Sequence, residues 1–225
     1  DIIEDGLVFN MDAANRASYV PNATTSYNTI NLTQSGSISG ATYISPPTSA
    51  SCWNFDDADD YIEIGTIGQG PLYDIGSGSF TVNMWCAKDI TSTFGWFISN
   101  FDSGENGFVM GVWDDAPSLY WRIYPGDFED SGYNIPADLS FHNYTLTRNS
   151  GTVEVYVDAV LVSGQNTEFT GSLSSPLVPT YLGKRNDSYA DQPWIGNIGP
   201  TQIYNRALTL TEVTQNYNAL KGRFV

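Results

Sequence analysis

The segment Phe80-Thr-Val-Asn-Met-Trp-Cys86 alternates apolar and polar side chains with a period of two residues. Phe80, Val82, Met84 and Cys86 share one face, which is typical of a β-strand with one buried face. Further segments show the same period: Tyr61–Ile64, Gly107–Trp113, Leu119–Tyr124, Tyr144–Arg148 and Thr152–Asp158. Gly, Pro, Asn and Asp turn signals such as Asn149-Ser-Gly151 separate these segments. About a dozen short strands at hairpin spacing predict an all-β protein, an antiparallel sandwich.

One segment near the C-terminus has helical rather than strand periodicity. Thr209-Leu-Thr-Glu212 has the spacing of a capping box, and Gly222 stands where a helix would end. The apolar residues between them recur at helical spacing: Leu210, Val213, Tyr217 and Leu220. We therefore expect one short helix over residues 210–220, packed on the sandwich. Residues 14–50 lack a period and predict a long surface excursion, within a single domain that spans residues 1–225.

Composition excludes several partners. The chain has 25 acidic and 9 basic residues, a net charge of −16 and only 15 % charged residues, against roughly 25 % in ordinary domains. Nine scattered cations cannot form the basic face that a nucleic acid requires, and they disfavour an anionic membrane surface. No apolar run approaches the roughly 18 residues of a membrane span. We therefore expect neither nucleic-acid binding nor membrane insertion.

The two cysteines do not form a disulfide framework. Cys52 and Cys86 each stand beside a tryptophan inside a strand-like run, which predicts two buried free thiols. A disulfide between them would imply an oxidising compartment, and the sequence leaves that alternative open.

Six segments, in their order along the chain, resemble the motifs of one known family. They are Gly6–Tyr19, Trp53–Ile64, Ser79–Trp85, Thr152–Val162, Leu182–Arg185 and Gly196–Leu208. Together they are similar to the laminin-G-like (LamG), concanavalin A-like jelly-roll domains, over about residues 5–224. The resemblance implies a jelly-roll sandwich of two antiparallel sheets with one short C-terminal helix.

The opening residues Asp12–Tyr19 and the closing residues Tyr204–Phe224 look especially like domains in structural proteins of tailed phages. This resemblance implies a non-enzymatic virion structural domain: a capsid decoration, a fibre or a tail adhesin on the virion surface. Its partners would be other virion proteins, further copies of itself in a homo-oligomer, and host-surface glycans. One alternative is a secreted carbohydrate-binding module of a larger cellular protein. A second alternative is a polysaccharide hydrolase or lyase.

The sequence departs from the family pattern in three places. Asp57 stands where the first turn usually has Gly, and Gly199-Pro200 stands where an Asp often helps to hold structural calcium. Ala159 replaces the Gly of the family's Asp-Gly hairpin. Because Ala at a positive φ costs roughly 1 kcal/mol, this hairpin is expected to use a different turn type.

An acidic turn is the candidate metal site. Calcium takes six to eight oxygen ligands, several of them from carboxylates. Four aspartates lie on this turn, and the family arrangement would bring one more Asp and one Asn near it: Asp56, Asp57, Asp59, Asp60, Asp12 and Asn197. These six residues predict one structural Ca²⁺. The alternative is that the Asp side chains hydrogen-bond turn amides and stay solvated.

No group of residues predicts catalysis. Related sandwich hydrolases carry Glu-x-Asp-x-x-Glu on a strand, and this string is absent. Glu154 and Asp158 share a strand face, but Asp158 belongs to a hairpin turn, while the acidic residues 127–130 lie in a Gly/Pro loop. His142, the only histidine, has no Gly-x-Ser-x-Gly partner motif, and we expect it to bond a loop at the start of a strand.

Aromatic side chains predict a glycan site. Alternation places Tyr120, Arg122 and Tyr124 on one face of their strand and Leu119, Trp121 and Ile123 on the core face. Three further aromatic residues lie in or next to loops: Tyr133, Tyr189 and Trp194. Sugars stack on such rings and bond nearby polar groups, so these six residues are the candidate glycan-binding set. The alternative is that the rings pack locally or against another subunit.

Overall fold

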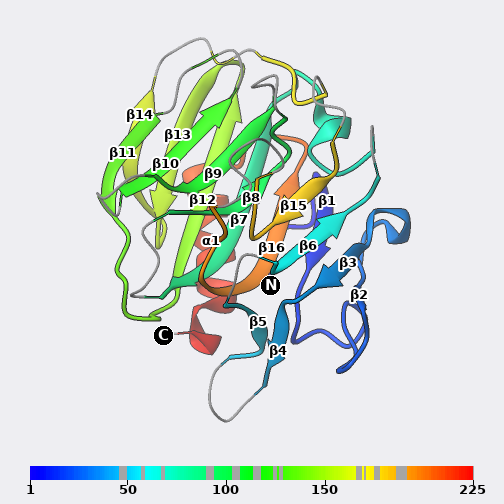
Figure 1. Cartoon of the computed structure of the whole chain (residues 1–225). Coiled ribbons are helices and arrows are strands. Elements are labelled where there is room, and N and C mark those ends of the chain that lie inside the picture. The colour runs from blue at the N-terminus through cyan, green and yellow to red at the C-terminus, as the bar shows by residue number, and fades with distance from the viewer. Residues whose placement is uncertain are drawn as a thin grey trace.

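The computed structural model describes the chain apart from a set of short segments and the side chain of Gln165 (Figure 1). The segments not described are 46–49, 57–58, 67–68, 90–93, 103–106, 114–117, 124–125, 127–128, 166–168, 170, 175–177, 186–191 and 225. Two antiparallel sheets pack face to face, and one helix lies behind them in the view of Figure 1. The predicted all-β sandwich is therefore confirmed.

Sheet A has the strand order β14-β13-β12-β7-β16-β5-β4, and β1 pairs with β16 outside this path. Its strands are β1 Leu7–Met11, β4 Thr42–Ile44, β5 Cys52–Phe55, β7 Phe80–Lys88, β12 His142–Asn149, β13 Thr152–Val157, β14 Val160–Gln165 and β16 Gly196–Tyr204. Strand β16 pairs with β7 along one edge, with β5 through residues 196–198 and with β1 through residues 201–204. This strand thus holds the N-terminal, middle and C-terminal parts of the chain in one sheet.

Sheet B has the order β11-β10-β9-β8-β15-β6-β3-β2. Its strands are β2 Thr25–Ser26, β3 Gly36–Ser39, β6 Tyr61–Ile64, β8 Gly95–Ser99, β9 Phe108–Val112, β10 Ser118–Ile123, β11 Glu129–Asn134 and β15 Thr180–Leu182. Two short 3-10 helices join the strands, η1 Leu32–Gln34 and η2 Tyr73–Ile75. The expectation of an irregular excursion over 14–50 was wrong in part, because this stretch contributes β2, β3 and β4 to the two sheets.

The core lies between the sheets. Val82, Met84 and Cys86 of β7 are fully buried there, as their alternation predicted. Phe97 and Trp121 join the same buried cluster from sheet B. Both cysteines are buried free thiols, as predicted, and burial raises the pKa of Cys86 well above the ordinary value.

Helix α1, Leu210–Leu220, has the bounds that the sequence predicted. Its capping box forms: the Thr209 side chain accepts a hydrogen bond from the Glu212 amide, and the Glu212 carboxylate accepts one from the Thr209 amide. Two expectations were wrong. Leu210 is 54 % exposed, because it lies in the first turn on the solvent side. Gly222 does not stop the helix at a left-handed residue, since the chain continues into the 3-10 turn η3, Lys221–Arg223.

The C-terminal segment covers the outer face of sheet A. The indole of Trp85 stacks with two rings of this segment, Tyr217 at 5.6 Å and Phe224 at 4.7 Å between centroids. Asn216, fully buried, accepts a hydrogen bond from the Ile3 amide at 2.8 Å and so ties the N-terminal segment to the helix. This layer therefore leaves the outer face of sheet B as the large face that α1 does not cover. Among the described residues, no helix combines the length and apolarity needed to cross a membrane.

The turn between β13 and β14 shows how the chain accommodates Ala159. Asp158 and Ala159 both have positive φ, 50° and 63°, so the hairpin keeps the left-handed geometry of the family's Asp-Gly turn. The expectation of a different turn type was wrong. The Asp158 carboxylate accepts hydrogen bonds from the Asn143 amide at 2.8 Å and from Nδ1 of His142 at 2.7 Å, and these bonds stabilise the turn. The expected role of His142, bonding a loop at a strand start, is confirmed.

Candidate functional site

Strand β10 presents its polar face to the outside of sheet B. Leu119, Trp121 and Ile123 are buried in the core, as alternation predicted. Tyr120 is half-buried on the opposite face, whereas Arg122 on that face is only 7 % exposed. The guanidinium of Arg122 donates a hydrogen bond from Nε to the Gly126 carbonyl at 2.8 Å. Arg122 was expected on the solvent or ligand face of its strand, and the structure places it on that face but buried against neighbouring rings.

These rings form a cluster on the outer face of sheet B, which we call the arginine–aromatic cluster: Trp96, Phe101, Trp113, Arg122 and Arg185. The guanidinium carbon of Arg185 lies 4.7 Å from the ring centre of Phe101, 5.1 Å from Trp96 and 6.0 Å from Trp113. That of Arg122 lies 5.1 Å from the Phe101 ring. These contacts are within cation–π range, so rings and cations hold one another in place.

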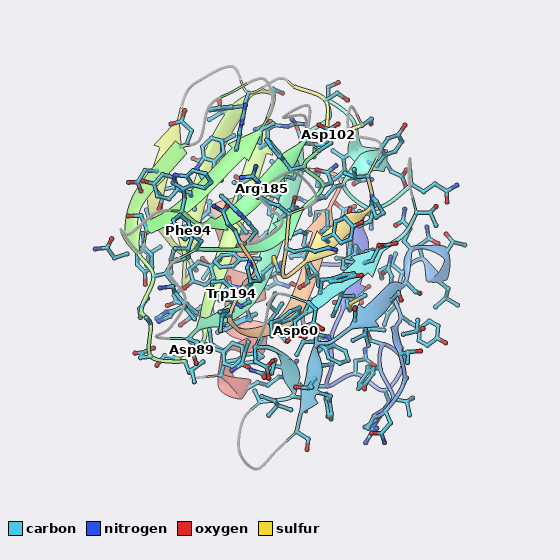
Figure 2. The ribbon with its side chains drawn as sticks, in the orientation of Figure 1. Asp60, Asp89, Phe94, Asp102, Arg185 and Trp194 are labelled. Atoms are coloured by element: carbon cyan, nitrogen blue, oxygen red, sulfur yellow. The ribbon has the colours of Figure 1, made fainter. Side chains whose placement is uncertain are left out.

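The backbone of the neighbouring strand makes room for this cluster. Gly111 of β9 pairs with Trp96 of β8. A Cβ at Gly111 would lie 2.2 Å from the Gly95 carbonyl oxygen and 2.7 Å from the Trp96 Cα, so only glycine fits there. In Figure 2, Arg185 lies over sheet B, between the labelled Phe94 and Asp102. The cluster is therefore built on paired strands rather than on loops alone, which favours a fixed geometry.

A second group continues this face across β15 and β6. The Lys184 ammonium lies 3.3 Å from the ring centre of Tyr61 and 4.5 Å from that of Tyr181. Tyr181 donates a hydrogen bond to the Glu63 carboxylate at 3.1 Å, and burial raises the pKa of its phenol. Burial also lowers the pKa of Lys184, while the nearby Glu63 charge opposes that shift. Lys184 and the two arginines place three of the nine basic residues of this acidic chain on one face.

Two further members of the predicted glycan-binding set, Trp194 and Tyr133, do not lie on this face. Trp194 was expected to lie beside a loop, but it is fully buried and packs edge-on against Phe97 at 4.7 Å. Tyr133 is half-buried against the main core, and burial raises the pKa of its phenol. Tyr124 and Tyr189 lie outside the described residues. Of the six, Tyr120 and Arg122 thus belong to the outer face of sheet B.

Three of the residues predicted to hold calcium are bound by protein partners: Asp12, Asp60 and Asn197. Asp12 forms a two-point ion pair with Arg223, with N–O distances of 2.7 and 3.0 Å. The buried Asp60 carboxylate accepts a hydrogen bond from the Asp56 amide at 2.6 Å. Asn197 accepts one from the Asn54 side chain at 3.0 Å.

This arrangement does not fit a calcium site that includes Asp12 and Asn197. In the described part of the chain, no three Asp, Glu, His or Cys side chains converge as metal ligands would. Asp56 and Asp59 are exposed, and Asp57 lies outside the described residues. Asp60 bonds a turn amide, as the alternative expected, but it is buried rather than solvated. A calcium ion at this turn stays a prediction.

Sequence reasoning missed most of the outer face of sheet B. Trp96 and Arg185 carry no local signal of exposure or pairing, because the cluster joins β8, β10 and the segment after β15 through the sheet order. The one signal was the family-like run Leu182–Arg185, which ends in two adjacent cations. The structure shows that these two side chains contact different sets of rings.

Comparison of the sequence with protein families agrees with this two-sheet sandwich. Residues 56–214 match the family Laminin_G_3, described as the concanavalin A-like lectin/glucanases superfamily. The chain therefore belongs to this superfamily. No curated protein sequence matches it significantly.

Several solved structures share the fold. Domain 4 of AbnA, an extracellular arabinanase of Geobacillus stearothermophilus solved with arabinotriose, aligns with a TM-score of 0.70 and 18 % identity, over 96 % of this chain and all of that domain. The binding domain of Paraclostridial Mosquitocidal Protein 1 aligns with a TM-score of 0.69 and 15 % identity, over 95 % of this chain and 52 % of that one. The sialidase of Trypanosoma rangeli aligns at 0.69 and 13 % identity, over 96 % of this chain and 33 % of the enzyme. At these identities the likeness shows the fold alone.

Proposed function

We propose that this chain is a carbohydrate-binding domain and that its ligand lies on the outer face of sheet B. The observation that carries the proposal is a row of partly exposed side chains on this face: Tyr120, Trp113, Tyr61 and Lys184. The buried members of the arginine–aromatic cluster lie beneath this row and hold it in place. Aromatic rings accept the apolar faces of sugars, and phenol and ammonium groups such as those of Tyr120 and Lys184 donate hydrogen bonds to sugar oxygens. Membership of the lectin/glucanase superfamily and the arabinotriose bound to the structurally similar arabinanase domain support it.

Binding without catalysis is part of the proposal. Canonical glycosidases need two carboxyl groups about 5–9.5 Å apart. The described strands of sheet B carry three carboxylates: Glu63 on β6, and Glu129 and Asp130 on β11. Strands β6 and β11 are five strand positions apart, about 24 Å at the usual spacing. Glu129 and Asp130 are adjacent in a strand and so point to opposite faces. These three carboxylates therefore do not form a catalytic pair.

The test is titration calorimetry of the purified chain with arabinotriose and a panel of other oligosaccharides. Tyr120→Ala is expected to weaken binding about tenfold, roughly 1.4 kcal/mol, as for an aromatic ring at a binding hot spot. Tyr27→Ala is the matched control, because Tyr27 is 44 % exposed and follows β2, six strand positions from β10. Equal affinity of Tyr120→Ala and wild type would refute the placement of the site. Turnover of a ligand, seen as new reducing ends, would refute the non-enzymatic part.

The narrower role predicted from residues 203–224, a structural domain on the surface of a tailed phage, is a second proposal. It rests on the pattern of that segment and on the resemblance it carries. An antibody raised against the chain would label intact phage particles in electron microscopy if this role is correct. Detection of the chain as a secreted module of a cellular protein would favour the alternative.

A further inference from the structure

A pocket of about 430 Å³ opens where the two sheets meet at β3 and β4, away from the arginine–aromatic cluster. Its wall comes from the segment 19–24, the end of β3 and the first residues of β4. Strand β3 is five strand positions from β10 in sheet B, so this pocket is separate from the face around Tyr120. Its volume is in the range of small-ligand sites, roughly 300–1,000 Å³. We call it the tyrosine pocket.

The aromatic wall of the tyrosine pocket is fixed by packing and hydrogen bonds. Tyr19 lies 5.2 Å from Tyr43 and 4.3 Å from Trp53, measured between ring centroids. Tyr43 donates a hydrogen bond to the Ser51 hydroxyl at 3.2 Å, and Tyr19 Oη accepts one from the Asn22 amide at 3.0 Å. Tyr19 and Trp53 are buried, whereas Tyr43 is half-buried and exposes part of its ring. The pocket thus has a preformed aromatic surface.

Three polar side chains line the same pocket: Asn22, Thr24 and Thr42. All three are exposed, and none of their side-chain polar groups hydrogen-bonds to another described residue. Asn22 has a φ of 72°, a left-handed conformation that is held by the hydrogen bond from its backbone amide to the Tyr19 hydroxyl. Non-glycine residues in this conformation occur where the surroundings require it, often at ligand sites. An amide and two hydroxyls can donate to and accept from the same ligand.

The lining of the tyrosine pocket carries no Asp, Glu, Lys, Arg or His, although 34 side chains of the chain are charged. A ring surface bordered by an amide and hydroxyls, without charge, matches a ligand that has apolar C–H faces and many hydroxyls. We propose that the tyrosine pocket is a second ligand site, and that it binds one neutral sugar unit of an oligosaccharide. The sugar stacks on Tyr43 and exchanges hydrogen bonds with Asn22 and Thr42. A polymer that reaches both sites gains affinity from this bivalency.

Amide chemical-shift mapping on the whole ¹⁵N-labelled chain tests this inference. The probes are cellotriose, maltotriose, xylotriose and arabinotriose, with trigalacturonate as the charged counterpart. At least one neutral probe is expected to shift the amides of Asn22, Thr42 and Tyr43 at millimolar concentration, while trigalacturonate leaves them unchanged. Shifts that avoid this pocket for all four neutral probes, or equal shifts with trigalacturonate, would overturn the proposal.

Two conservative variants test which groups bind. Asn22→Gly keeps the left-handed backbone and removes the side-chain amide. Thr42→Val keeps the shape of the side chain and removes its hydroxyl. Each is expected to weaken the neutral probe about fivefold, the effect of one neutral hydrogen bond. Thr152→Val on β13, away from the pocket, is the matched control for Thr42→Val. Tyr120→Ala changes the first proposed site and leaves this pocket intact, so each of the two proposals can be refuted without the other. Unchanged affinity in both pocket variants, with a native spectrum, would overturn the assignment.

Discussion

Replacing Arg148 with methionine is expected to lower the free energy of unfolding by about 2–3 kcal/mol. Arg148 is 1 % exposed at the end of β12, and its guanidinium joins two loops. It donates hydrogen bonds to the carbonyls of Gly76 at 3.2 Å, Gly171 at 2.7 Å and Gly78. Its charge also lies 4.8 Å from the ring centre of Phe80.

The magnitude follows from which acceptors lose their partner. The Gly76 carbonyl keeps a second bond, from the Leu173 amide at 2.9 Å, but no other described hydrogen bond reaches the carbonyls of Gly78 and Gly171. Each carbonyl that is left without a hydrogen-bond donor costs roughly 1–3 kcal/mol when it is buried. The cost is lower where water reaches the carbonyl, as at the exposed Gly78. Methionine also relieves the desolvation that lowers the pKa of Arg148 to about 10, which offsets part of the loss.

Urea unfolding followed by tryptophan fluorescence measures this change. In thermal unfolding of a chain of this size, the same loss of stability should lower the melting temperature by about 4–12 °C. Arg148→Lys should not restore stability, because one ammonium cannot reproduce the planar fork of the guanidinium. Arg16→Met, at an exposed position, is the control and should stay within about 0.5 kcal/mol. If Arg148→Met is as stable as Arg16→Met, the reasoning about the two loops is refuted.

Three further results are expected. Glu212→Gln should lower the free energy of unfolding by about 1 kcal/mol at neutral pH, because bonds from Arg206 and from the helix cap hold the pKa of Glu212 at about 2. Denaturant titrations should show this difference from wild type disappearing as pH falls from about 4.5 towards 2. The hydrogen bond to Asp158 raises the pKa of His142, so the NMR titration of this histidine should have a midpoint above 6.5, and a midpoint below 6.5 would contradict this reasoning. The His142–Asp158 bond should stabilise the fold fully below pH 6.5, and this contribution should be lost as pH rises through the midpoint. Cys52 and Cys86 should resist a thiol reagent in the native protein, and both should react after unfolding, as counted by absorbance.

Local periodicity was enough to predict most strand faces. Phe80–Cys86 and Leu119–Ile123 bury the residues that alternation selects, since each strand has one face against the core. The helix could be predicted because the Thr209–Glu212 capping box is a local signal. Strand β3 could not, since its Gly and Ser residues have weak strand propensity, and β4 has only three residues, too few to show a period. Both are held in their sheets by pairing with the more distant β6 and β5.

The candidate site was less predictable for a related reason. Tyr120 and Arg122 could be assigned to the outer face from their own strand, but the burial of Arg122 depends on Phe101 and Gly126, which other segments supply. The burial of Trp194 depends on Phe97 across the sandwich. Asp12 was expected near the acidic turn, whereas Arg223, more than two hundred residues later, pairs with it. Contacts of this kind follow from the assembled sheets and leave no local pattern.

The position of both chain ends has a consequence for how the domain can be tethered. Ile3 is bound to Asn216 of α1, and Phe224 stacks on Trp85, so both ends lie on the helix side of sheet A (Figure 1). A linker, an affinity tag or a neighbouring domain joined at either end leaves from that side. The domain can therefore be immobilised by either terminus with the arginine–aromatic cluster pointing away from the support. A sensor surface loaded through one terminal tag should thus present the same outer face of sheet B as one loaded through the other.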